Sequence, residues 1–185
     1  MVKIQTYLLI PVLLLLACAA SAKIETADMG PFIAEFDVGD AAGEHEIIIN
    51  PPYQFDNYNE YYFRVDSTAE PYIDVYIDDY GSSVDVSEGK LMEVIENTFG
   101  KINRGATFDW RLLASVGGRP AVFANVTYNN GRHAGYDANG KHAGYDAAYS
   151  PDGIGNLGSI IVGIYSAYPE SVTDKFLSKL KIKRT

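Results

Sequence analysis

Apolar and polar residues alternate along several short stretches of this chain, as they do in strands that bury one face. Four such stretches occupy the first half: residues 32–38, 44–49, 61–65 and 71–79. In the last of them, Ile73, Val75 and Ile77 form a β-branched face that we expect to enter the core. The opposite face is polar and aromatic, with Tyr72, Asp74, Tyr76 and Asp78.

Prolines and glycines mark where the expected strands end. The second stretch stops at Asn50-Pro51-Pro52, because proline has no amide hydrogen to donate to a neighbouring strand. Further along, Gly117-Gly118 separates the strand-like residues 108–116 from 119–128, which predicts a tight hairpin. A last strand-like run covers residues 159–168.

Two segments carry apolar residues at helical spacing. The first begins after Ser87, a suitable N-cap, and places Leu91 and Ile95 on one face. The second begins near Ser171, which together with Asp174 resembles a capping box. We expect the basic side chains of residues 179–184 to lie in solvent at the end of this helix, where they complement its dipole.

Many strands and few helices predict the α+β class, here an antiparallel sheet of about six to eight strands packed by two helices. We expect residues 23–185 to form a single globular domain, because a chain of this length buries an adequate core. Residues 130–147 are expected to form a duplicated hairpin insertion in that domain.

The second half also resembles a known architecture. A helix, the hairpin from Trp110 to Tyr128, the strand from Ile160 to Tyr168 and a C-terminal helix ending in Leu-Lys-Ile look like the Mog1/PsbP-like α/β/α sandwich. The resemblance spans residues 85–183 and is architectural, without a catalytic motif. It implies a binding or accessory role, although a shared fold does not fix function.

The N-terminus has the pattern of a secretory signal over residues 1–22. Lys3 precedes an apolar run at residues 7–17, which is shorter than the about 20 residues that a membrane span needs. Cleavage after Ala20-Ser21-Ala22 would release a secreted chain starting at Lys23. Alternatively, the Leu-Leu-Ala-Cys of residues 15–18 resembles a prokaryotic lipobox, in which Cys18 would carry lipid. A third interpretation keeps the segment as an uncleaved anchor.

The remaining composition narrows the possible chemistry. Cys18 is the only cysteine, so the domain has no internal disulfide, no cysteine metal ligand and no thiol nucleophile. Asn125-Val126-Thr127 is a sequon, which makes Asn125 a candidate glycosylation site in an extracytoplasmic protein.

The acidic balance limits the expected partners. The chain has 24 Asp and Glu against 15 Lys and Arg, a net charge of −9 at pH 7. Such a charge disfavours nucleic acid and anionic lipid. We therefore expect an envelope protein or a small ligand as partner, with membrane contact only through a lipid on the N-terminus.

Motifs of common enzymes are missing from the sequence. There is no Gly-x-Ser-x-Gly, no His-Glu-x-x-His and no phosphate loop. Residues 153–158 match Gly-x-Gly-x-x-Gly, but they precede a strand instead of joining a strand to a helix, so we reject a dinucleotide site. Carboxylates are numerous, and the sequence singles out no pair for acid–base work.

The most distinctive feature is a tandem repeat of nine residues within 130–147. The two copies differ only at Arg132 and Lys141, and the Asn139-Gly140 between their central parts is a strong hairpin signal. A hairpin turning there would place four potential metal ligands on one face: His133, Asp137, His142 and Asp146. In that register Asp137 lies opposite His142, and His133 lies opposite Asp146.

Strand geometry argues against one metal bound by all four side chains. His133 and Asp137 would lie about 13 Å apart at roughly 3.3 Å per residue, whereas ligands must converge to within about 2 Å of a zinc ion. The register therefore favours two separate His–Asp pairs on a projecting surface element.

Three functional hypotheses follow from the sequence. The leading one is a non-enzymatic, extracytoplasmic binding or accessory protein of a prokaryotic cell envelope, without a cofactor. The second is a metal-binding protein that holds a divalent cation with the duplicated His and Asp residues. The third is a hydrolase with an unrecognised carboxylate pair, which a pocket containing two converging carboxylates would favour.

Overall fold

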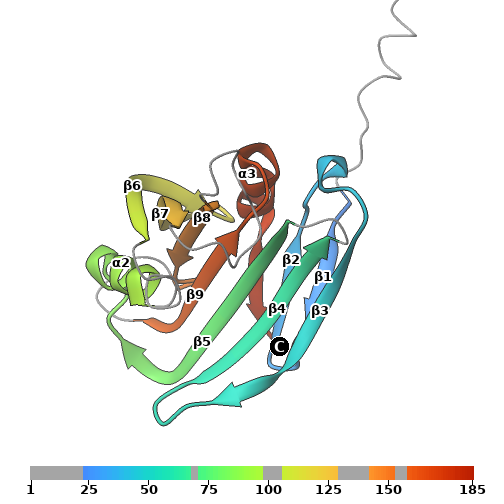
Figure 1. The fold of residues 1–185 in the computed structure, drawn as a ribbon. Coiled ribbons are helices and arrows are strands. Elements are labelled where there is room, and N and C mark those ends of the chain that lie inside the picture. The colour runs from blue at the N-terminus through green and yellow to red at the C-terminus, as the bar shows by residue number, and fades with distance from the viewer. Residues whose placement is uncertain (1–22, 68–70, 98–105, 129–141, 153–157) are drawn as a thin grey trace, which may run out of the picture.

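The computed structural model describes residues 23–67, 71–97, 106–128, 142–152 and 158–185. Within these ranges seven strands form one sheet in the order β3-β4-β5-β9-β8-β7-β6, and every neighbouring pair is antiparallel. Its strands are β3 (His45–Gln54), β4 (Asn59–Ser67), β5 (Tyr72–Val84), β6 (Thr107–Val116), β7 (Arg119–Tyr128), β8 (His142–Tyr149) and β9 (Gly158–Ser166). The large antiparallel sheet and the α+β class are as the sequence predicts (Figure 1).

A smaller sheet of the described residues has the order β1-β2-β10. It contains β1 (Glu25–Asp28), β2 (Phe32–Phe36) and β10 (Lys181–Arg184). The basic side chains of Lys181, Lys183 and Arg184 are exposed as expected, but they belong to a strand paired with β2 and not to a helix end. Lys183 binds Glu35 on β2, and Arg184 reaches Asp79 on β5 at 2.9 Å.

Two α-helices, α2 (Glu88–Ile95) and α3 (Glu170–Lys179), and the short 3-10 turn η1 (Asp40–Ala42) complete the described fold. Ser87 caps α2 as expected, with its hydroxyl accepting a hydrogen bond from the Lys90 amide. The capping box expected at Ser171 is wrong, because α3 starts after Pro169 without a side-chain cap. In the described ranges, neither helix is long and apolar enough to cross a membrane.

The large sheet separates two apolar clusters. Its core face packs against α3 and the small sheet, and the Phe36 ring lies 5.3 Å from those of Phe63 and Phe176. As the alternation predicts, Ile73, Val75 and Ile77 point to this face and are fully buried. We call the opposite side the α2 face, since α2 packs there.

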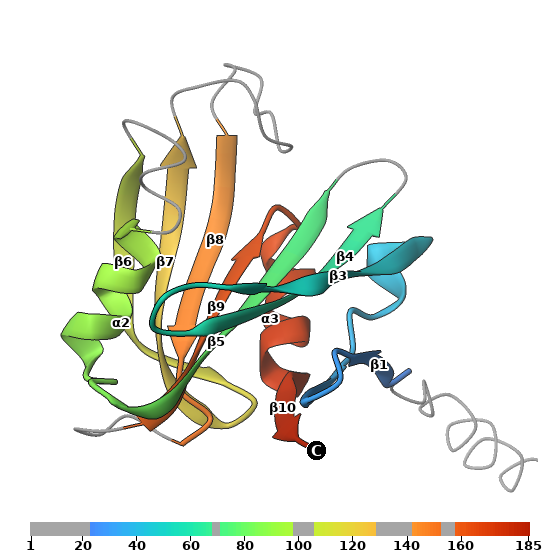
Figure 2. The same ribbon diagram turned by 90° about the horizontal axis from the view of Figure 1, so that it is seen from below.

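Helix α2 covers only part of its face. It contacts β7, β8 and β9, through apolar side chains that include Leu91 and Ile95. Figures 1 and 2 show α2 beside β6 and β7, with β3 and β4 at the other end of the sheet. Val94 of α2 also lines a pocket with residues of β4 and β5, whereas Tyr53 of β3 remains 63% exposed.

The edge strand β3 tolerates its two prolines. Pairing with β4 is interrupted between Asn50 and Tyr53, around Pro51 and Pro52, because neither proline can donate a hydrogen bond. Pairing resumes at Tyr53 and continues to Gln54, so the expected end of the strand is wrong. The extension brings Tyr53 into register with Glu60.

The predicted hairpin insertion is not confirmed. Residues 142–147, expected as its second arm, belong to β8 and lie between β7 and β9 inside the large sheet. The rest of the repeat, through Lys141, lies outside the described residues. Six of the nine residues of the second repeat copy are thus part of the sheet and not of a projecting surface element.

Candidate functional site

Of the four predicted metal ligands, the structure describes two. His133 and Asp137 lie outside the described residues, and His142 is the first residue of β8. Asp146 is fully buried in β8, opposite Ala124 on β7 and Tyr165 on β9. Both edges of the strand are occupied there by β7 and β9, and the predicted pairing of Asp146 with His133 involves a residue outside the described ranges.

The other two predicted sites are the lipidation site Cys18 and the glycosylation site Asn125. Cys18 lies outside the described residues. Asn125 is half-buried in β7, opposite Tyr145, and its Oδ1 has no hydrogen-bond partner among the described residues. Glycosylation of Asn125 stays a prediction. No group of three His, Cys, Asp or Glu side chains within the described ranges lies close enough to hold a metal ion.

A different cluster stands out on the α2 face of β4 and β5. Glu60 lies directly opposite Asp78, and Tyr62 lies opposite Tyr76. Directly opposed side chains in an antiparallel pair have Cβ atoms about 5 Å apart. The register therefore places two carboxylates side by side, with a pair of tyrosines on the next row.

Two pockets open on this cluster and share Glu60 and Tyr76. The larger, of 540 Å³, is lined by Asn50, Pro51, Tyr53, Phe55, Glu60, Tyr62 and Tyr76. The smaller, of 300 Å³, is lined by Tyr58, Glu60, Tyr76, Asp78, Val94, Asn97 and Gly163. Gly163 lies beside Tyr76 on β9, where the missing side chain leaves the pocket floor open.

Aromatic rings surround the two carboxylates. The Tyr53 and Phe55 rings are 4.6 Å apart, Phe55 stacks on Tyr58 at 4.5 Å, and Tyr58 contacts Tyr80 at 5.2 Å. Tyr53 and Phe55 remain 63% and 41% exposed, unusual for large apolar side chains outside a binding surface. We call these rings, with Tyr62, Tyr76, Glu60 and Asp78, the aromatic–carboxylate cluster.

Burial makes ionisation of the two carboxylates unfavourable. It raises the pKa of Asp78 to about 7, and the neighbouring charge of Glu60 contributes to the rise. Burial also raises the pKa of Glu60. The Oδ1 atom of Asp78 is buried and accepts no hydrogen bond from the described residues. Among the described residues that line the two pockets, no Lys or Arg offsets the charge of these carboxylates.

Burial and the same negative charges also raise the pKa values of two tyrosines in the cluster. Burial, followed by the charges of Asp78 and Glu60, raises the pKa of Tyr58 to about 12. Burial, Asp78 and Glu93 raise the pKa of Tyr80 to about 12 as well. Both phenols are thus neutral near pH 7 and present the electron-rich faces of their rings.

Arg64 is a described cation on the same face, and it is already paired. Arg64 donates two hydrogen bonds to Asp74, at 2.6 and 3.0 Å, and Tyr62 donates a third at 2.6 Å. The Arg64 guanidinium also lies 4.1 Å from the centre of the Tyr72 ring. These contacts fix the orientation of Tyr62 and leave Arg64 unavailable to Glu60 and Asp78.

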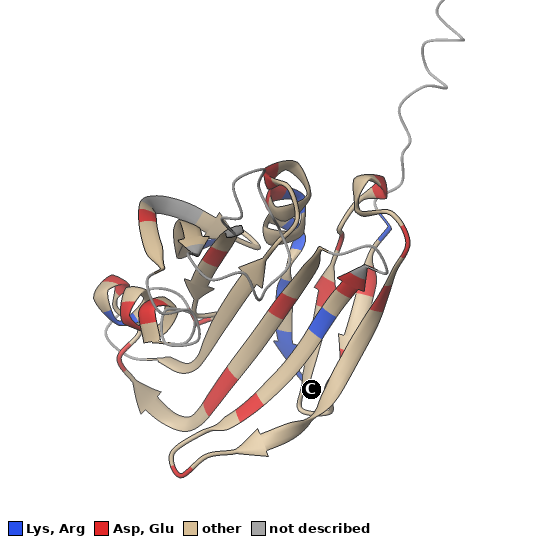
Figure 3. Cartoon of the chain, in the orientation of Figure 1, with Lys and Arg blue, Asp and Glu red and all other residues tan. Residues whose placement is uncertain are grey.

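Figure 3 shows how charged residues are distributed along the strands and helices. Acidic positions recur along β4 and β5, whereas basic positions gather on α3 and β10. No Lys or Arg is among the described residues that line the two pockets. A ligand that brings a positive charge would compensate the two carboxylates and contact the surrounding rings.

The sequence contains part of this site. The alternation of residues 71–79 correctly places Tyr76 and Asp78 on one face, but it does not reveal which residues lie opposite them. Glu60 falls just before the expected strand 61–65, and Tyr53 to Tyr58 fall in an expected loop. The signal that would have found the cluster is an alternation shared by the two strands. Charged and tyrosine residues alternate in both: Glu60, Tyr62 and Arg64 in one, and Asp74, Tyr76 and Asp78 in the other.

Comparison with known proteins adds no relative, because no protein-family model, no curated protein and no solved structure matches the chain. The Mog1/PsbP-like resemblance stays a prediction.

Proposed function

We propose that this chain is a non-enzymatic binding protein that recognises an organic cation, an alkylammonium group, at the aromatic–carboxylate cluster. The observation that carries the proposal is the opposed pair Glu60 and Asp78, which lies in a ring of aromatic side chains without a Lys or Arg among the described pocket residues.

Two attractive terms favour an alkylammonium ligand. A cation over an aromatic face gains about 0.5–2 kcal/mol, depending on how far it is desolvated. A positive charge beside Glu60 and Asp78 also offsets the unfavourable burial of these two carboxylates. A neutral ligand of the same shape would gain the apolar contacts and lose both electrostatic terms.

We place this function outside the cytoplasm, since residues 1–22 have the pattern of a secretory or lipoprotein signal. The partner would be a small molecule or an envelope protein that presents an alkylammonium group. Determining the mass of the processed protein tests this part: a chain starting at Lys23 indicates plain secretion, a lipid-bearing chain starting at Cys18 indicates an anchor, and retention of Met1 contradicts both.

The cluster also supports a second candidate function, hydrolysis. Two carboxylates in one pocket can act as general acid and as base or nucleophile in glycoside cleavage. The raised pKa of Asp78, about 7, suits a general acid near neutral pH. Turnover of nitrophenyl glycosides that is abolished by Asp78→Asn would favour this function over simple binding.

The binding proposal is tested by removing one carboxylate at a time. Glu60→Gln and Asp78→Asn keep the shape of the pocket, and each should weaken binding of choline about tenfold, as measured by calorimetric titration. Glu46→Gln is the matched control, because Glu46 is an exposed carboxylate of β3 that lines neither pocket. Equal choline affinity in all four proteins would contradict the proposal.

A further inference from the structure

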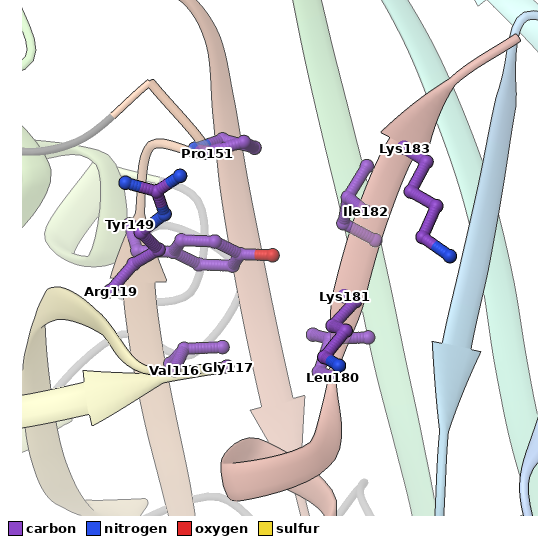
Figure 4. A pocket seen from close by; sticks show the side chains of 9 residues that line it. All are labelled: Val116, Gly117, Arg119, Tyr149, Pro151, Leu180, Lys181, Ile182 and Lys183. Carbon is purple, nitrogen blue, oxygen red and sulfur yellow. The ribbon is translucent and has the colours of Figure 1, made fainter.

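A third pocket, of 300 Å³, lies on the opposite side of the fold, between the β6–β7 turn and β10. Figure 4 shows its lining side chains: Val116, Gly117, Arg119, Tyr149, Pro151, Leu180, Lys181, Ile182 and Lys183. Three of these residues are basic and none is acidic, which is unusual for a chain of net charge −9.

The Tyr149 hydroxyl is a buried hydrogen-bond donor in this pocket. Tyr149 is only 2% exposed, and its Oη has no hydrogen-bond partner among the described residues. In Figure 4 its ring runs from β8 toward β10, and the hydroxyl points into the space between them. A buried donor without an acceptor is costly, so the position favours a ligand with an acceptor oxygen.

Two of the three basic side chains are free to meet such a ligand. Neither Arg119 nor Lys181 forms an ion pair with another described residue. Arg119 lies close enough to Tyr149 for its charge to lower the pKa of the phenol, against the larger raising effect of burial. Lys183 is different, because its ammonium group binds Glu35 on β2.

The walls of the pocket are fixed by backbone contacts. The Gly117 amide donates a 2.7 Å hydrogen bond to the Leu177 carbonyl, which ties the β6–β7 turn to α3. A Cβ on Gly117 would come within 2.0 Å of the Leu180 carbonyl oxygen, so the turn packs tightly against the start of β10. The pocket is therefore preformed, and its ligand need not order a loop.

We infer that this pocket binds a phosphate-type oxyanion, with Tyr149 donating a hydrogen bond to it and Arg119 and Lys181 supplying the opposing charge. An oxyanion satisfies all three groups at once, since its oxygens accept hydrogen bonds and carry negative charge. Arg119 can bind two of its oxygens together, which a neutral acceptor does not exploit.

Titration of the full domain with inorganic phosphate, followed by amide chemical shifts, tests the inference. Resonances of residues 116–119, 149 and 180–182 should shift together and saturate. Tyr149→Phe removes only the hydroxyl and should weaken phosphate binding about tenfold, the effect of losing one hydrogen bond to a charged group. Arg119→Gln should weaken it at least as much.

The control is Lys179→Gln, which removes one exposed positive charge from the end of α3 without lining the pocket. It should leave the phosphate affinity unchanged. If Tyr149→Phe binds phosphate as well as the original protein does, the hydroxyl has no part in a phosphate site and the inference is wrong. A uniform small shift of all basic residues would likewise contradict it.

Two sources can supply the oxyanion, and a second titration separates them. Binding of soluble glycerol phosphate with the same variant pattern assigns the site to free phosphate compounds. Binding only to vesicles of phosphatidylglycerol, lost in Arg119→Gln and absent on phosphatidylcholine vesicles, assigns it to a lipid headgroup. No binding in any titration overturns the inference.

Discussion

At the scale of single residues, two carboxylates on the α2 face of β5 differ in their hydrogen bonding. Asp74 is buried and receives three hydrogen bonds from Arg64 and Tyr62. Asp78, two positions further along β5, has an Oδ1 atom without a hydrogen-bond partner among the described residues. Asp74 thus stabilises the sheet, whereas Asp78 is held at a cost that a ligand can remove.

The Arg64–Asp74 pair should be essential for stability. Arg64→Met removes two of the three hydrogen bonds that the buried Asp74 carboxylate accepts from Arg64 and Tyr62, so the free energy of unfolding should fall by about 2–4 kcal/mol. Urea denaturation measures it. Lys183→Met is the control, because its ion pair with Glu35 is exposed and should contribute less than about 1 kcal/mol. Equal losses in the two variants would contradict this account.

Asp78 should make stability fall as the pH rises. Its pKa in the folded protein is about 7, above the roughly 3.9 of an unfolded chain, so the folded state binds the extra proton between these values. The stabilising effect of protonation is full below about pH 4 and is lost as the pH approaches 7. Asp78→Asn should therefore flatten the stability profile between pH 4 and 7 and increase stability at pH 8.

The measurement is the free energy of unfolding from urea titrations at several pH values, with Glu46→Gln as the reference for a surface carboxylate. A profile for Asp78→Asn that parallels the original protein would show that Asp78 titrates normally.

At the scale of elements, the sequence predicts those whose own residues determine them. The β-branched face of β5, the Ser87 cap of α2 and the glycine turn between β6 and β7 are all found where expected. Each depends on a local pattern: alternation, a capping side chain, or two residues with positive φ.

Elements that depend on distant partners were not predicted. β10 is a polar Lys-Ile-Lys-Arg segment whose strand conformation comes from pairing with β2, about 150 residues earlier in the chain. β8 contains residues of the repeat whose local sequence would also suit a hairpin. Its pairing with β7 and β9 determines that these residues form an inner strand of the sheet. For the same reason, the partnership of Glu60 with Asp78 follows from strand register and not from local sequence.

The β6–β7 turn supplies a matched test of packing. Gly117 and Gly118 have φ angles of 56° and 78°, so alanine at either position meets backbone strain of about 1–2 kcal/mol. Only at Gly117 would the added Cβ also collide with the Leu180 carbonyl, whereas no atom lies within 4 Å at Gly118. Gly117→Ala should therefore destabilise the domain clearly more than Gly118→Ala in urea denaturation. Equal effects would mean that the turn does not pack against β10 in this way.

At the scale of the whole molecule, charge is divided between two sides of the large sheet. The α2 face has two carboxylates within aromatic rings, and the other side has a basic pocket beside β10. The net charge of −9 does not describe either site, because one site has carboxylates and the other has Lys and Arg side chains. The two sites are built from different strands, so a variant in one should not alter ligand binding in the other.

The central claim is that the aromatic–carboxylate cluster recognises positive charge and not only shape. Choline and 3,3-dimethylbutan-1-ol have nearly the same shape, and only choline is charged, so a calorimetric titration of both ligands at pH 8 isolates the charge. We expect choline to bind at least tenfold more tightly, and its affinity to fall as the pH drops below 7 and Asp78 takes up a proton. Equal affinity for the two ligands, or no binding of choline at pH 8, would contradict the claim.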